Sequence, residues 1–245
     1  MFPLRDENPT FHTSVVTFAI IGLNAAAWIL LQGVGTNPAL AKSLCLFGFI
    51  PGEFLQTVEQ GLTIPLGQGL YCVTDAERNW LSPLTSMFMH GGWAHLIINM
   101  WFLFIFGDNV EDVMGYGRFI VFYLLCGFAA VAAQMISNPS STIPMVGASG
   151  AIGGVMGGYA VLFPKAPVHM LVFLGFLLTR IVVPAYFMLG YWFLLQLLSA
   201  VPTIGRSTGG VAFWAHIGGF LAGVVLVKLF VNPQRLEARN RKIQS

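Results

Sequence analysis

Charged residues are scarce in this chain, and that scarcity limits the class of protein it can be. Only 9% of the 245 residues are Asp, Glu, Lys or Arg, whereas 56% are hydrophobic. A soluble globular protein carries about 25% charged residues. The composition therefore predicts an integral membrane protein. The net charge of +2 is small and the basic residues form no stripe, which argues against a nucleic-acid partner.

Cysteine is also rare, and the three Cys residues show no metal-binding pattern. Cys45, Cys72 and Cys126 form no C-x-x-C pair and have no Cys/His spacing suited to zinc. Cys126 lies in an apolar run and is expected in the core. Cys45 and Cys72 share one long loop, where they would form a disulfide if that loop faces an oxidising compartment. Two free thiols are the alternative.

Six apolar runs have about the length that a helix needs to cross a bilayer core, roughly 20 residues. They lie at residues 14–32, 85–106, 119–137, 149–163, 183–201 and 211–230. The polar start lacks a small-residue cleavage site, so the first run is expected to be retained as a helix. The pattern predicts an all-α, polytopic membrane protein with six transmembrane helices. Its regions are an N-terminus at 1–13, a six-span domain at 14–231 and a basic tail at 232–245.

The fourth and sixth runs are rich in glycine. Small residues let helix backbones approach closely inside a membrane bundle. The fourth run is therefore predicted to be a central helix surrounded by protein, and the sixth to carry a second close-packing face. The glycines concerned are Gly150, Gly153, Gly154, Gly157 and Gly158 in the fourth run, and Gly219 and Gly223 in the sixth.

Two other segments need a place outside the spans. Residues 33–84 form a long amphipathic loop rich in Gly, Pro and Phe, and a loop of that length is usually functional or folded back on the membrane surface. Residues 168–182 are apolar but contain His169 and Arg180. We expect this second segment at the cytoplasmic interface.

The basic residues are unevenly distributed between the two sides of the predicted bundle. Six spans put both termini on one side, and nine of the 12 basic residues fall there. The other side has only Lys42, Arg78 and Arg206. The positive-inside rule therefore predicts that both termini are cytoplasmic.

Strongly polar side chains are few within the runs, and each is costly in hydrocarbon unless it has a function or a partner. Our candidates are His90, His95 and Asn99 in the second run, Ser149 at the start of the fourth and His216 early in the sixth. Runs two, four and six all go from outside to inside in this topology, so the candidates near their starts share one depth near the outer third of the membrane. His95 and Asn99 are four residues apart and lie on one helix face.

These residue types suit nucleophilic catalysis. A serine hydroxyl needs a base to remove its proton, and a neutral imidazole can do so, which pairs Ser149 with His216. Asn99, His95 and the Ser149 backbone N–H are donors for the negative charge that develops on an attacked carbonyl. No Asp or Glu lies within a run to orient His216, so the pair would act as a dyad.

Glycines flank the serine and leave room for a substrate strand to approach. The chain resembles the rhomboid proteases over about residues 84–231. The resemblance lies in Gly147-Ala148-Ser149-Gly150, in Ala215-His216-Ile217-Gly218-Gly219 with Gly223, and in His90, His95 and Asn99.

That resemblance implies an intramembrane serine endopeptidase that works without metal or cofactor. Its substrates would be single-pass transmembrane proteins, cleaved at or near helix-destabilising residues at the outer face of the bilayer. The enzyme would lie in a bacterial cytoplasmic membrane among lipids, with its active site open to the extracytoplasmic side. The resemblance implies that Ser149 is the nucleophile and His216 the base. It also implies that the oxyanion site is formed by His95, Asn99, Gly147 and Ala148, and that the supporting residues are His90, Gly150, Gly219 and Gly223.

The chain departs from the family pattern at two places. Many members have Trp-Arg shortly before the second span, where this chain has Trp80-Leu81-Ser82, so the loop is expected to be anchored differently. Many have an aromatic ring four residues after the nucleophile, where this chain has Gly153. Tyr159 and Phe213 are candidates for a ring that would hold His216 instead.

Two other functions are consistent with parts of the sequence. One is a catalytically inactive rhomboid-like protein that binds membrane clients, which the missing ring at Gly153 keeps open. The other is a small proton-coupled transporter with His90, His95 and His216 as its proton path. The chain has neither an internal repeat nor an intramembrane carboxylate, features that would favour a transporter.

Overall fold

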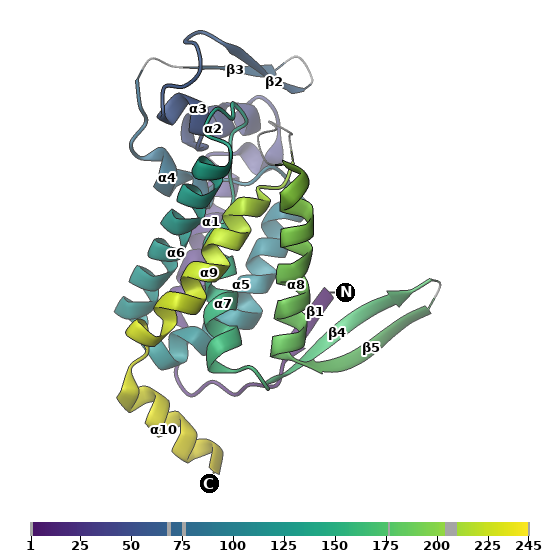
Figure 1. The fold of residues 1–245 in the computed structure, drawn as a ribbon. Coiled ribbons are helices and arrows are strands. Elements are labelled where there is room, and N and C mark those ends of the chain that lie inside the picture. The colour runs from purple at the N-terminus through teal and green to yellow at the C-terminus, as the bar shows by residue number, and fades with distance from the viewer. Residues whose placement is uncertain (1, 68–69, 75–76, 176, 204–209, 245) are drawn as a thin grey trace.

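The computed structural model describes residues 2–67, 70–74, 77–175, 177–203 and 210–244, which form a mostly helical bundle (Figure 1). Arg206, which entered the charge count above, lies outside these residues, as do both end residues. Six apolar helices lie near the six predicted runs. They are α1 (Val15–Leu30), α5 (Trp93–Met114), α6 (Tyr116–Ser137), α7 (Ser149–Leu162), α8 (Ala185–Ala200) and α9 (Phe213–Phe230).

Not all six helices are long enough to cross a membrane by themselves. In the described residues, α6, α9 and α8 extended to Thr203 by η3 (Val201–Thr203) have the required length and apolar character. A fourth span results if α5 is joined to the bent segment before it. At 1.5 Å per residue the 16 residues of α1 and the 14 of α7 cover only about 24 and 21 Å. Six complete spans therefore stay a prediction.

The second predicted run was wrong at its start. The chain forms α4 (Ser82–Thr85) and η2 (Ser86–Phe88), then bends by 91° before α5 begins at Trp93. Two consecutive glycines, Gly91 and Gly92, lie in the break, and glycine disfavours a continuing helix. His90 consequently lies in the break and not on the helix that carries His95 and Asn99.

The prediction of an all-α fold was wrong for the segment that follows α7. Strands β4 (Pro167–Leu174) and β5 (Leu177–Pro184) form an antiparallel hairpin, and β1 (Phe2–Asp6) pairs with β4 (Figure 1). Val168, Met170 and Val172, which are two residues apart along β4, are buried in the main core. This period of two is the pattern of a strand with one buried face, and it explains why an apolar segment with His169 and Arg180 does not form a helix.

The long loop is folded and lies at one end of the bundle (Figure 1). It contains η1 (Gly33–Gly35), α2 (Ala39–Phe47), α3 (Pro51–Phe54) and the hairpin β2 (Thr63–Gly67) and β3 (Leu70–Val73). A disulfide joins Cys45 to Cys72, the first of the two alternatives that the sequence left open. An antiparallel β-bridge between the backbones of Phe49 and Met145 joins the loop to the segment that leads into α7.

Helix α7 is the centre of the bundle and packs most extensively on α9, with α6 and α5 on its other sides. Every residue from Gly150 to Tyr159 is buried. A Cβ added at Gly219 would lie 1.9 Å from the carbonyl oxygen of Gly150, and one at Gly223 would lie 1.9 Å from that of Gly154. The two helix backbones therefore touch, which only glycine permits at these positions.

Charged side chains hold the opposite end of the bundle together. Glu111 of α5 accepts hydrogen bonds from the first backbone N–H groups of α1, those of Val16 and Thr17, at 2.9 and 2.7 Å. Asp112 pairs with Arg239 of the tail helix α10 (Pro233–Gln244) at 3.1 Å, and both side chains are buried. The tail helix is thus fixed to the end of α5, away from β2 and β3 (Figure 1).

Candidate active site

Ser149 is the first residue of α7 and follows a loop with a special conformation. Gly147 has φ +122°, and its N–H donates to the Ser86 carbonyl at 2.9 Å. A Cβ at Gly147 would lie 2.7 Å from Nε2 of His95 and 3.6 Å from Nδ2 of Asn99. Conformation and space both require glycine here. The loop before Ser149 therefore lies directly against the polar face of α5.

His216, on the first turn of α9, lies within hydrogen-bond distance of the serine. Its Nε2 is 2.8 Å from Oγ of Ser149. The contact between Gly150 and Gly219 brings the two helices close enough for these side chains to meet. This is the separation expected between a nucleophile and its base.

The other side of the His216 ring contacts α8, which the sequence analysis did not predict. Nδ1 of His216 is 2.8 Å from Oε1 of Gln196, and the ring of Trp192 lies over it with centroids 5.8 Å apart and planes tilted by 34°. Of the two rings expected to hold His216, Phe213 contacts it edge-on at 6.5 Å. Tyr159 was the wrong candidate, because its hydroxyl bonds to Asp6 far along the helix.

His95 and Asn99 of α5 present donor groups beside Gly147. The N–H of Gly91 donates to Nδ1 of His95 at 3.3 Å, so the neutral His95 ring carries its proton on Nε2, the nitrogen nearest Gly147. Asn99 is 5% exposed, and its Nδ2 has no hydrogen-bond partner among the described residues. A buried amide donor without a partner is rare and suggests a ligand-binding role.

His90 lies behind His95 and has no direct contact with the serine–histidine pair. Its ring is fully buried and meets the His95 ring edge-on with centroids 5.0 Å apart. Gln32 holds its backbone by two hydrogen bonds, of 2.7 and 2.8 Å. Neither ring nitrogen of His90 has a partner within the described part of the chain. His90 thus packs against His95.

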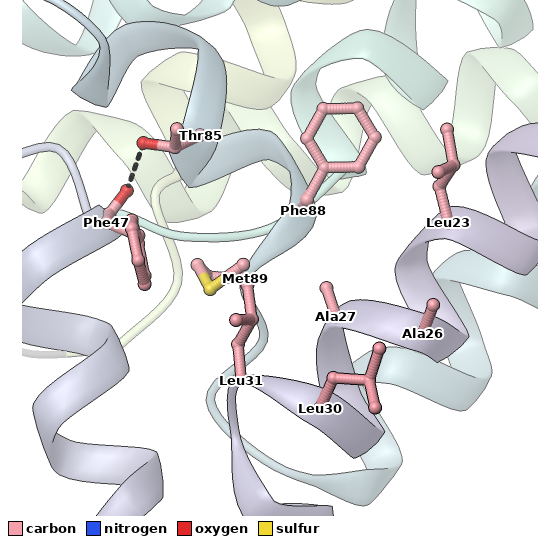
Figure 2. Close-up of a pocket in the computed structure, with 9 residues that line it drawn as sticks. All are labelled: Leu23, Ala26, Ala27, Leu30, Leu31, Phe47, Thr85, Phe88 and Met89. Atoms are coloured by element: carbon pink, nitrogen blue, oxygen red, sulfur yellow. Dashed lines mark hydrogen bonds between the residues drawn. The ribbon is translucent and has the colours of Figure 1, made fainter.

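Two cavities are lined in part by residues of the η2 turn or next to it. A small one of about 20 Å³ adjoins Ser149 and is lined mostly by Gly and Ala residues, with Ser86 and Met87. A larger one of about 430 Å³ lies between α1, Phe47 and the η2 turn (Figure 2). Figure 2 shows that its walls are apolar apart from Thr85, whose Oγ1 bonds to the Phe47 carbonyl at 2.9 Å. Among the described residues that line the larger cavity there is no acid, base or free hydroxyl.

Comparison with known proteins finds one family model, the Rhomboid domain, which matches residues 77–233. Rhomboid protease GluP of Bacillus subtilis is 35% identical over 148 residues, which are 60% of this chain and 25% of that protein. Rhomboid-like protein 11, chloroplastic, of Arabidopsis thaliana is 32% identical over 155 residues, 61% of this chain and 52% of that protein. The chain thus matches a quarter of the length of the first relative and about half of the second.

Proposed function

This chain belongs to the rhomboid family of membrane-embedded proteins, which includes serine proteases, and on that premise we propose that it is an intramembrane serine endopeptidase. One observation carries the proposal: the 2.8 Å between Oγ of Ser149 and Nε2 of His216. A serine in that contact loses its proton to the imidazole as it attacks a peptide carbonyl.

The reaction follows from the groups around the pair. His216 takes the Ser149 proton, the alkoxide adds to the carbonyl, and His216 then gives the proton to the leaving amine. His216 then deprotonates a water molecule that attacks the acyl-enzyme. The bond to Oγ of Ser149 breaks, the carboxylic acid product leaves, and His216 returns the proton to Oγ. Nε2–H of His95, Nδ2–H of Asn99 and the backbone N–H of Ser149, free at the start of a helix, would hold the oxyanion.

We further propose that the site opens to the extracytoplasmic side of a bacterial cytoplasmic membrane, with both termini in the cytoplasm. The loop that leads to Ser149 is paired with the disulfide-bonded loop through Phe49 and Met145. Disulfides persist in oxidising compartments, and most basic residues lie at the opposite end. Both observations support the same orientation.

The proposed substrates are transmembrane proteins, single-pass ones in particular. The small cavity limits the size of the side chain next to their scissile bond. A cavity of about 20 Å³ beside Ser149 has room for a water molecule or a methyl group, and not for a ring. Substrates with Gly, Ala or Ser next to the scissile bond should therefore be cleaved, and substrates with Phe or Trp there should be cleaved slowly.

The decisive test is Ser149→Ala, with a reporter transmembrane substrate in proteoliposomes. Cleavage should disappear while the protein stays folded, and a fluorophosphonate probe should label Ser149 only when His216 is present. The matched control is Ser137→Ala, since the Ser137 hydroxyl bonds its own helix at the Gln134 carbonyl. Cleavage that survives Ser149→Ala would refute the proposal. Client binding without any labelling of Ser149 would favour the inactive rhomboid-like alternative, and proton flux that survives Ser149→Ala would favour the transporter.

A further inference from the structure

The His216 ring has hydrogen-bond contacts at both nitrogens, and the second contact belongs to a different helix from the first. Nε2 faces Ser149 of α7 at 2.8 Å, and Nδ1 faces Oε1 of Gln196 of α8 at 2.8 Å. The imidazole of α9 is therefore held between two helices. A dyad fixed by packing alone would leave Nδ1 without such a partner.

The contact with Gln196 determines the tautomer of His216. An amide oxygen can only accept a hydrogen bond, so Nδ1 of His216 must carry the proton. Nε2 then has its lone pair directed at Ser149, the state required of a general base. The amide cannot turn over without cost, because its Nε2 donates to the Trp192 carbonyl at 3.4 Å.

Trp192, one helical turn before Gln196, holds the plane of the same ring. Its indole packs against the His216 ring at a tilt of 34°, and its far edge is 3.8 Å from where a Cβ of Gly153 would be. The ring that is absent at Gly153 is thus replaced from α8. The two contacts that α8 makes with His216 come from Trp192 and Gln196, which are four residues apart.

We propose that Gln196 is a positioning residue for His216, so that the site works as a Ser149–His216–Gln196 arrangement. This inference rests on the proposed protease function and extends it. An amide fixes the tautomer as a carboxylate would, without the cost of burying a negative charge within a membrane. Gln196 acts only through the imidazole and touches no substrate atom.

The first test compares Gln196→Leu with the intact chain in proteoliposomes. Leucine has a similar size but no acceptor, so kcat and the rate of fluorophosphonate labelling should fall by roughly 10- to 100-fold with KM unchanged. The matched control is Gln134→Leu, which also removes an amide from a predicted span but on a different helix, α6, and should leave both rates unchanged. Wild-type kcat and labelling rate in Gln196→Leu would overturn the inference.

The second test uses Gln196→Glu, which keeps the acceptor and adds a charge. Activity should be retained, and the acidic limb of the rate–pH profile should move to higher pH, because a carboxylate stabilises the protonated imidazole. A merely structural role predicts an unmoved profile, and that outcome overturns the inference even where Gln196→Leu fails to fold.

The two tests also distinguish failure of this inference from failure of the proposed protease function. If the wild-type serine is never labelled and no substrate is cleaved, the protease proposal and this inference fail together. If Ser149 is labelled and cleavage depends on it, but the Gln196 variants behave as wild type, only the inference fails.

Discussion

Asn99 brings a buried amide to the loop that precedes Ser149, and this makes it the most testable donor of the site. Donors to an oxyanion act mainly in the transition state, so Asn99→Ala should lower kcat by about 100- to 1,000-fold with little change in KM. The measurement is steady-state cleavage of a reporter substrate in proteoliposomes. Asn24→Ala is the control, because this buried amide on α1 bonds its own helix at the Ile20 carbonyl. Equal losses in the two variants would contradict the role.

At the residue scale, side-chain chemistry was more predictable than side-chain pairing. Ser149, His216, His95 and Asn99 could be selected because polar groups within apolar runs are costly and rarely incidental. The same rule covers Gln196, which lies within the run 183–201 and was overlooked. Its pairing with His216 depends on how α8 is rotated about its axis, and local sequence does not specify that rotation.

Helices α7 and α9 pack through their backbones, which makes their glycines intolerant of any side chain. A Cβ at Gly219 would lie 1.9 Å from the Gly150 carbonyl oxygen, so Gly219→Ala must push the helices apart. We expect a loss of about 1 to 3 kcal/mol or more in stability, with cleavage abolished because Ser149 and His216 separate. Gly190→Ala on α8 is the control, since nothing lies within 4 Å of its added Cβ. Thermal unfolding in detergent measures both, and wild-type stability of Gly219→Ala would refute the packing.

The N-terminal strand makes stability depend on pH through Asp6. Burial raises the pKa of Asp6 above its ordinary value of 3.8, although the hydrogen bond from Tyr159 and the charge of Arg239 oppose this. The folded state therefore keeps a proton that the unfolded chain has lost, and this contribution to folding is lost as pH rises from about 4. The Tm of the wild type relative to Asp6→Asn should fall as the pH rises above about 4. A difference in Tm between the wild type and Asp6→Asn that does not change with pH would contradict the effect.

At the element scale, the wrong predictions relied on apolar composition and did not use the spacing at which apolar residues recur along the chain. Residues 168–182 were expected at the interface with no strand, although Val168, Met170 and Val172 alternate with less buried residues, which indicates a strand. The break before α5 was signalled by Gly91 and Gly92. The pairing of β1 with β4 joins segments more than 160 residues apart, and no local pattern predicts such a contact.

At the scale of the whole molecule, the two ends of the bundle differ in chemistry. One end has the disulfide-bonded loop and the segment leading to Ser149. The other has the buried pair of Asp112 and Arg239, together with the tail helix. The charge asymmetry could be read from the sequence, whereas the disulfide depended on how the loop folds. Together they make the orientation in the membrane the property of the whole chain to measure.

The orientation predicts which thiols a membrane-impermeant maleimide can reach in bacterial cells. The cytoplasmic membrane is kept sealed, and its outer face is made accessible to the reagent. Cys45 and Cys72 should be unreactive until a reductant opens their bridge and should then be labelled without permeabilisation, because their loop would face outward. A cysteine introduced by Asn240→Cys in α10 should be labelled only after permeabilisation, because the basic tail would lie in the cytoplasm. Buried Cys126 serves as the internal control and should stay unlabelled until the protein is unfolded. Labelling of Asn240→Cys in sealed cells would show the opposite orientation, in which the site at Ser149 opens to the cytoplasm.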